Sequence, residues 1–471
     1  MGLSAVQGLA NLRLRLAFWL KMLRSPLARR CASVGLALVA VLVAVVAALA
    51  ASPLDLGFGI KGVVETPLPP AGAERVRDSG QGPLIEDLAR APSGRILAAL
   101  GSGGETPYFG AARYRPGGAL DKSFGEEGFV SLEATYRAVS GEAELEALAP
   151  QRDGEVVLAG YRRNRYGHSA PLLVRLRSDG KPDRSFGNGG LVAPHPVGKG
   201  AEVLHAVAVL PNGRIVAVGA RNEHGGGKPA ALAIAYRPNG RIDRGFGNGG
   251  RILFASHSGD YTALRSVALL PSGKLLAAGY RDNRLFVVRL HQNGRIDRSF
   301  GDGGKVSIDL GLTSCCPIRA GLALVPGGGS VLFAGVPSGG TKLVRLQPNG
   351  ARQRSFGRQG VLFDRNARRL VEPGGLAVQR NSHIVLVGTT VRGRPSDGQA
   401  QSVFTAARYL PNGRPDRGFG KDGMSFQPLG YNSIGTSALA LPNGKVLLGG
   451  GNQVADKGGF DFRLLLARTR P

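Results

Sequence analysis

The chain has 471 residues, a hydrophobic content of 43% and a net charge of +27. This hydrophobic content excludes global disorder, and the three cysteines are too few for a disulfide framework or a cysteine-rich metal site. Glycine is abundant, with 73 residues, while aromatic residues make up only 6%. Such a mixture favours many short strands joined by glycine turns over a helical protein.

The N-terminal part predicts a membrane anchor. Residues 1–31 hold six basic groups and no acidic one, and residues 32–51 contain no charged side chain. An apolar helix of about twenty residues spans a hydrocarbon core of roughly 30 Å, and the positive-inside rule keeps its basic flank in the cytoplasm. We therefore expect a single-pass signal anchor in the cell membrane, with residues 52–471 on the extracytoplasmic side. The alternative is a signal peptide cleaved after Ala48-Leu49-Ala50, which has the required small-x-small pattern.

The rest of the chain is an array of repeats. Its clearest element is Asp297-Arg-Ser-Phe-Gly-Asp-Gly-Gly304, which recurs at intervals of about sixty residues. Each copy places a phenylalanine at the same point: Phe58, Phe124, Phe186, Phe246, Phe300, Phe356 and Phe419. We expect each phenylalanine to pack beneath a glycine turn, and the leading aspartate to cap that turn with its carboxylate.

Each repeat predicts four short strands. Between two Phe-Gly motifs, apolar runs flank a tight turn, as in Ala206–Leu210, Pro-Asn-Gly213 and Arg214–Gly219, which is typical of a hairpin. A third run ends in a further Asn-Gly turn before the motif, and a short fourth run follows the motif. Seven such units predict an all-β, seven-bladed β-propeller of four-stranded blades.

The two ends of the array complete one another. Leu466–Pro471 matches Ala111–Pro116, and the residues that follow Pro116 in that repeat are supplied by Ser52–Asp55 at the start of the exported part. An open solenoid needs distinct polar caps instead. We therefore expect a closed ring.

These motifs resemble the delta-60 repeat family of bacterial β-propeller-like proteins. The shared pattern is Arg-Leu-x-x-Asn-Gly-x-x-Asp-x-Ser-Phe-Gly-x-x-Gly, with Pro-x-Gly-Lys/Arg-Ile-x-x-x-Gly between copies, over about residues 52–471. The resemblance implies an exported or surface repeat scaffold and transfers no catalytic residue. Gln353 departs from the motif aspartate and Ala235 from the strand arginine, so we expect less regular blades there.

Variable loops at one end of the ring are the predicted binding face, because loops on a rigid scaffold commonly carry function. Arginine forks suit carboxylate or phosphate groups. The arginines concerned are Arg162, Arg163, Arg165, Arg221, Arg281, Arg284, Arg392 and Arg394. The alternative is a solvated loop face without a ligand. The acidic segment Glu142–Glu146 is interpreted as a solvated turn.

No catalytic, metal or cofactor site is predicted. The seven histidines lack metal-ligand spacing, and no nucleophile elbow, P-loop or paired-carboxylate signature is present. Cys315 and Cys316 form a vicinal disulfide or a free pair. The expected function is binding or scaffolding of a protein or an anionic envelope polymer, rather than of nucleic acid. The alternative is an extracytoplasmic lyase or hydrolase acting on sugars or esters, for which a non-repeated polar cluster at the ring axis is the distinguishing feature.

Overall fold

The computed structural model describes residues 52–69, 82–101, 109–132, 143–163, 168–193, 201–222, 227–311, 319–335, 340–363, 372–392, 400–427, 429–430, 432–456 and 459–471. Residues 53–471 form one compact unit. Within the described ranges, no helix is long and apolar enough to cross a membrane. The predicted span 32–51 lies outside those ranges, as do Cys315, Cys316, Arg165 and Arg394.

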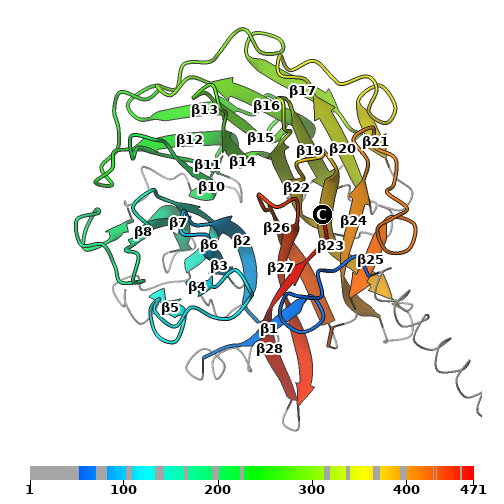
Figure 1. Cartoon of the computed structure of the whole chain (residues 1–471). Helices are drawn as coiled ribbons and strands as arrows, with labels where there is room; N and C mark the ends of the chain where they lie inside the picture. Colours follow the sequence, from blue (N-terminus) through cyan, green and yellow to red (C-terminus); the bar gives the residue numbers. More distant parts are fainter. Residues whose placement is uncertain are drawn as a thin grey trace, which may run out of the picture. The chain divides into compact units, whose positions relative to one another are not determined.

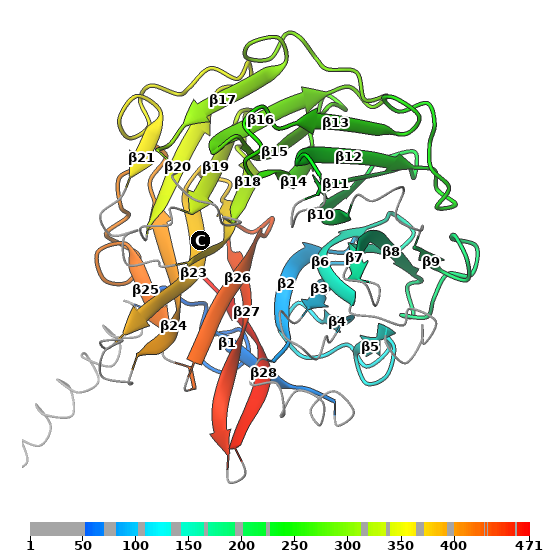
Figure 2. The same ribbon diagram turned by 180° about the vertical axis from the view of Figure 1, so that it is seen from behind.

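The unit is a β-propeller of seven four-stranded antiparallel sheets around a common centre (Figures 1 and 2). Blade 1 comprises β2 (Leu84–Arg90), β3 (Ile96–Gly101), β4 (Gly110–Tyr114) and β5 (Phe129–Ser131). Blade 2 comprises β6 (Ala143–Pro150), β7 (Val156–Arg163), β8 (Ser169–Leu176) and β9 (Leu191–Val192). Blade 3 comprises β10 (Glu202–Val209), β11 (Ile215–Arg221), β12 (Ala230–Tyr236) and β13 (Arg251–Ala255). Blade 4 comprises β14 (Thr262–Leu269), β15 (Leu275–Arg281), β16 (Arg284–Leu290) and β17 (Lys305–Asp309).

The remaining blades follow the same order. Blade 5 comprises β18 (Ala320–Leu324), β19 (Ser330–Gly335), β20 (Thr341–Leu346) and β21 (Val361–Phe363). Blade 6 comprises β22 (Glu372–Val378), β23 (Ile384–Arg392), β24 (Gln401–Tyr409) and β25 (Met424–Gln427). Blade 7 comprises β26 (Asn432–Ala440), β27 (Val446–Asp456), β28 (Gly459–Arg468) and β1 (Val63–Pro67).

Blade 7 closes the ring by joining the two ends of the array. Strand β1 pairs antiparallel with β28, from Val63 opposite Ala467 to Pro67 opposite Arg463. The Asp55 N–H donates to the Arg468 carbonyl at 2.7 Å, and the Arg468 Nε lies 2.7 Å from the Asp55 carboxylate. The predicted circular handover between the chain ends is therefore confirmed.

The seven motif phenylalanines are all buried, with at most 2% of each side chain exposed. They lie in apolar clusters that join neighbouring blades; the cluster around Phe300, for example, also contains Leu276 of blade 4 and Leu332 of blade 5. The glycine after each phenylalanine is required by the backbone. At Gly301 the φ angle is 56°, and a Cβ atom there would lie 2.2 Å from the Lys305 carbonyl oxygen.

In five of the seven motifs, an arginine on the third strand binds the motif aspartate. Arg289 binds the Asp297 carboxylate at 2.6 Å, stacks 4.7 Å from the Phe300 ring centre and donates to the Pro348 carbonyl of blade 5 at 2.6 Å. Asp297 also accepts the Ser299 N–H, as the predicted turn cap requires. Burial opposes ionisation of Asp297, but bonds from Lys274, Ser299 and Arg289 outweigh it and hold its pKa well below the usual range. The equivalent arginines are Arg113, Arg175, Arg408 and Arg468.

The two departures from the motif leave the blades intact. In blade 3, where Ala235 replaces the arginine, Arg214 from the hairpin turn binds Asp243 at 2.5 Å instead. In blade 5, Gln353 donates to Ser355, and Arg345 still reaches the Pro411 carbonyl of blade 6. Both blades keep four strands.

Candidate ligand site at the propeller axis

The first strand of every blade lines the axis. These strands, β2, β6, β10, β14, β18, β22 and β26, each contact the next around the ring. At the end where they begin they enclose a cavity of about 550 Å³, to which all seven contribute. Because neighbouring strands are antiparallel, the second strands end at this end of the ring too.

A β-bulge shapes the cavity wall. In six blades the register between the first and second strands shifts by one residue at the same place, which leaves one residue unpaired. Blade 5 shows no such shift in its described pairing. Bulges re-aim side chains, and every bulged residue lines the cavity. The six are Glu86, Glu146, His205, Arg265, Gly374 and Thr436.

The wall formed by blades 1 to 5 is charged. His205 Nδ1 lies 2.6 Å from Glu146 Oε2 and 3.1 Å from Arg265 Nη1. Since arginine can only donate, a proton on Nδ1 belongs with the Glu146 contact, and an unprotonated Nδ1 accepts from Arg265. Tyr161 donates its hydroxyl proton to Glu144. This wall combines acidic, basic and tautomer-dependent groups on rigid strands.

Burial changes the acidity of the carboxyl groups on this wall. It raises the pKa of Glu86 to about 7, against the opposing charge of Arg319, whose Nη1 is 3.7 Å away. The nearby carboxylates Glu146, Glu144 and Asp87 add to the rise. Burial also raises the pKa of Glu144, although the Tyr161 hydroxyl bond opposes it.

The wall formed by blades 6 and 7 is polar but uncharged. Asn432 accepts the Ser402 N–H at 2.9 Å and donates to Gln453 at 3.1 Å. Asn452 is only 4% exposed, and its side-chain nitrogen and oxygen make no hydrogen bond within the described part of the chain. Leaving a buried amide unpaired costs about 1–3 kcal/mol.

Glycines bring blades 6 and 7 close together. A Cβ atom at Gly374 would lie 2.1 Å from the Gly435 carbonyl oxygen, so only glycine fits where this strand passes its neighbour. The bulged position that carries a glutamate, histidine or arginine in blades 1 to 4 therefore has no side chain in blade 6. The charged side chains of the cavity are thus concentrated on the wall formed by blades 1 to 5.

The described loop arginines lie at the end of the ring where the second strands end, none of them lines the cavity, and local contacts hold most of them. Arg162 donates to the Ala193 carbonyl at 3.5 Å, Arg163 stacks on Tyr161, and Arg392 stacks on Phe426. Arg221 ends β11 and is half-buried.

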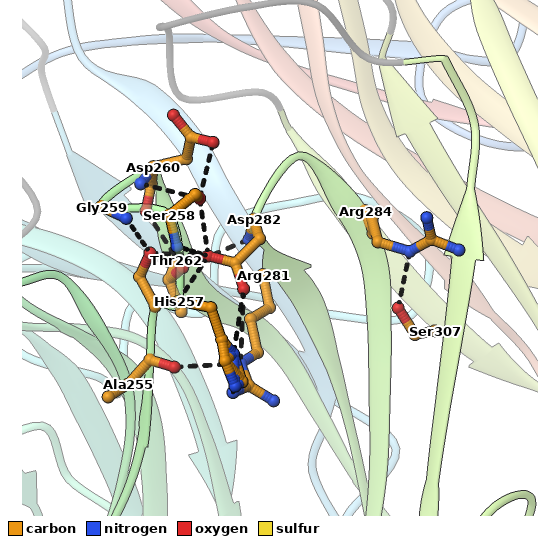
Figure 3. A network of polar contacts seen from close by, with 11 residues as sticks. Ala255, His257, Ser258, Gly259, Asp260, Thr262, Arg281, Asp282, Arg284 and Ser307 are labelled. Carbon is orange, nitrogen blue, oxygen red and sulfur yellow. Dashed lines mark hydrogen bonds and ion pairs between the residues drawn. The ribbon is translucent and has the colours of Figure 1, made fainter.

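Arg281 and Arg284 flank the β15–β16 turn (Figure 3). Arg281 donates to the Ala255 carbonyl at 3.0 Å and contacts His257, whereas Arg284 is exposed and binds Ser307 and Asp309. Between them, Asp282 accepts hydrogen bonds from Ser256, His257 and Ser258. Burial opposes ionisation there, but these bonds outweigh it and lower the pKa of Asp282.

The sequence interpretation missed the axial residues. It assigned Glu142–Glu146 to a solvated turn, whereas Glu144 and Glu146 belong to β6 and line the cavity. The signal was a polar residue at one position of otherwise apolar runs: Leu145-Glu146-Ala147, Leu204-His205-Ala206 and Leu264-Arg265-Ser266. Among the described residues, no group of three or more histidine, cysteine, aspartate and glutamate side chains is arranged to hold a metal ion.

Fold and site together define a seven-bladed β-propeller with a polar axial cavity. The family model described as "Domain of unknown function (DUF5122) beta-propeller" matches residues 151–186 and 270–300. Both segments run from a first-to-second-strand turn to a motif phenylalanine. No curated protein matches the sequence.

Solved structures resemble the chain only at low similarity. A protein of unknown function from Dyadobacter fermentans is 11% identical, with 87% of this chain and 100% of that chain covered and a TM-score of 0.42. YCF48 from Cyanidioschyzon merolae is 13% identical, with 86% and 98% covered and a TM-score of 0.44. The NanB sialidase from Streptococcus pneumoniae is 12% identical, with 89% and 71% covered and a TM-score of 0.38. Likeness of this degree carries no argument between a binding module and an enzyme.

Proposed function

We propose that this chain is a membrane-tethered, extracytoplasmic binding or scaffolding propeller whose variable-loop end engages a protein or an anionic envelope polymer. Residues 32–51 are the proposed anchor, supported by the six basic groups that precede an uncharged apolar run. The observation that carries the binding proposal is the shared position of the loop arginines. Strands β7, β11, β15 and β23 all end at the same end of the ring, and each ends in arginine.

Two charge-matched variants test the binding face. The first replaces five arginines of the variable-loop end with glutamine: Arg162, Arg163, Arg221, Arg284 and Arg392. The second replaces five exposed arginines near the tight turns of the opposite end: Arg152, Arg237, Arg241, Arg295 and Arg414. Arg214, Lys274 and Lys445 are unsuitable controls, because each binds a motif aspartate.

Both variants lose the same charge, so binding that depends only on the net charge of the protein should weaken equally in both. We expect the first variant to lose far more affinity than the second for anionic lipid vesicles or an acidic polymer, measured at one fixed ionic strength. Equal losses contradict a specific face.

Protease accessibility tests the proposed topology. In intact spheroplasts, added protease should digest the part after residue 52 and spare an N-terminal tag. Complete protection contradicts export, and a mature N-terminus at Ala51 indicates cleavage of a signal peptide.

A second candidate function is an extracytoplasmic lyase or hydrolase acting on sugar or ester substrates. It is favoured by the non-repeated polar cluster at the axis, where Glu86 has a pKa of about 7. A general acid or base is most effective when its pKa is near the working pH. Hydrolysis of aryl glycosides or aryl esters by the purified chain, lost in Glu86→Gln, supports this function. Activity that survives in Glu86→Gln contradicts a catalytic role for this glutamate.

A further inference from the structure

The axial cavity is lined by more carboxyl groups than guanidinium groups, although the chain as a whole is strongly basic. The protein carries a net charge of +27, yet Glu86, Glu144 and Glu146 come together on two adjacent inner strands. The cavity volume of about 550 Å³ suits a small molecule, since such sites commonly occupy about 300–1,000 Å³. A cavity lined by three carboxyl groups, two guanidinium groups and one histidine leaves room for the charge of a ligand cation.

The carboxylates are unequally compensated. Glu146 faces His205 at 2.6 Å and Arg265 at 3.9 Å. Glu86 has only Arg319, 3.7 Å away and about half exposed, and Glu144 has the neutral Tyr161 hydroxyl. Within the described part of the chain, no lysine or arginine lies within ion-pair distance of Glu144. Burial makes both carboxyl groups harder to ionise, and a ligand cation placed beside them would favour their ionised form.

The facing wall supplies hydrogen bonds without charge. It presents Ser402, Asn432, Thr436, Asn452 and Gln453. Asn452 adds an observation independent of the acidic wall, because its buried amide has both a donor and an acceptor unpaired within the described residues. Hydroxyl groups, which donate and accept, match such an amide.

We propose that the axial cavity binds a small polyhydroxylated amine, of the amino-sugar type, with its ammonium group at Glu86 and Glu144 and its hydroxyl groups toward Asn452. An anion is disfavoured, because both cavity arginines already face glutamates. This site is distinct from the proposed arginine face, so either can fail without the other.

Calorimetric titration of the purified full chain with three sugars of similar size tests the proposal. The probes are glucosamine, which carries an ammonium group, neutral N-acetylglucosamine and anionic glucuronate. We expect glucosamine to bind in clear preference to the other two. Preference for glucuronate, or no binding of any of the three at millimolar concentration, overturns the proposal.

Substitutions of cavity residues test whether the ligand binds in the cavity. Glu86→Gln, which resembles the protonated acid in shape, should weaken glucosamine binding at least about tenfold through loss of a charge-assisted hydrogen bond. Glu126→Gln removes an exposed carboxylate at the opposite end of the ring and should leave binding unchanged. Asn452→Leu should weaken binding several-fold while raising the melting temperature of the free protein. Glucosamine affinity that is unchanged in both cavity variants overturns the placement.

Discussion

Glu86 and Asp87 are adjacent carboxyl groups that burial makes harder to ionise. Burial raises the pKa of Glu86 to about 7 and that of Asp87 to about 6, although Asp87 accepts backbone N–H groups from Leu148 and Leu88. Both pKa values are higher in the folded than in the unfolded chain. Their contribution to stability is therefore complete below about pH 4 and is lost as the pH rises through about 6 to 7.

Glu86→Gln should abolish the part of this pH-dependent loss of stability that comes from ionisation of Glu86. At pH 5 the variant and the native chain should have similar free energies of unfolding, and at pH 8 the variant should be more stable by about 2–3 kcal/mol. Urea unfolding at the two pH values measures the difference. A variant that is equally destabilised at both contradicts a raised pKa.

Phe300→Ala tests whether the motif phenylalanine joins the blades. The side chain is 2% exposed and packs in a cluster with residues of blades 4 and 5. We expect a loss of about 3–5 kcal/mol in the free energy of unfolding. Phe363, which is 40% exposed, is the matched control, and Phe363→Ala should cost less than about 1 kcal/mol. Similar losses in the two variants are incompatible with the packing described.

In five blades the turn after the third strand contains an ion pair between an arginine and the motif aspartate. Blade 5 lacks this pair, so introducing the aspartate there measures how much the pair stabilises the protein. Arg345 is half-buried, and no carboxylate partner for it occurs among the described residues, because Gln353 stands where the motif has aspartate. Burial lowers the pKa of this arginine. Gln353→Asp should restore the pair and raise stability by about 1 kcal/mol.

Gln353→Asn is the neutral control and should give no comparable gain. Thermal unfolding of both variants beside the native chain measures the effect. A melting temperature of Gln353→Asp at or below that of Gln353→Asn shows that the arginine does not need a carboxylate there.

The whole ring depends on the pairing of its two ends. Deleting residues 467–471 removes the buried Ala467 and Thr469, and also Arg468, which binds Asp55. We expect the loss of several kcal/mol and a clearly lower melting temperature. Adding five glycine and serine residues after Pro471 is the control and should leave the transition unchanged. An unchanged melting temperature after the deletion is the result expected of an open array.

Most of the architecture can be predicted from the sequence because the same motif is repeated seven times. The recurrence of the phenylalanine, the turns and the complementary ends predicts blade number, strand number and closure. The axial site escapes this reasoning because it consists of differences between repeats. Glu146, His205 and Arg265 hold equivalent bulged positions, but only the register of the paired strands shows that these side chains meet at the axis. The contact between the Arg289 side chain and the Pro348 carbonyl could not be predicted either, since the two residues belong to different blades.

The closing strand also has a mechanical consequence. With the N-terminal segment held in a membrane as proposed, a pull on the tether enters the propeller beside Pro53 and Asp55. These residues are bonded to Arg470 and Arg468 at the far end of the chain. Beyond them, β1 lies in register with β28, so a force along β1 loads the hydrogen bonds of the ladder in shear, together rather than in succession. The point of attachment is thus the point of closure, and tension on the tether is resisted by both ends of the propeller at once.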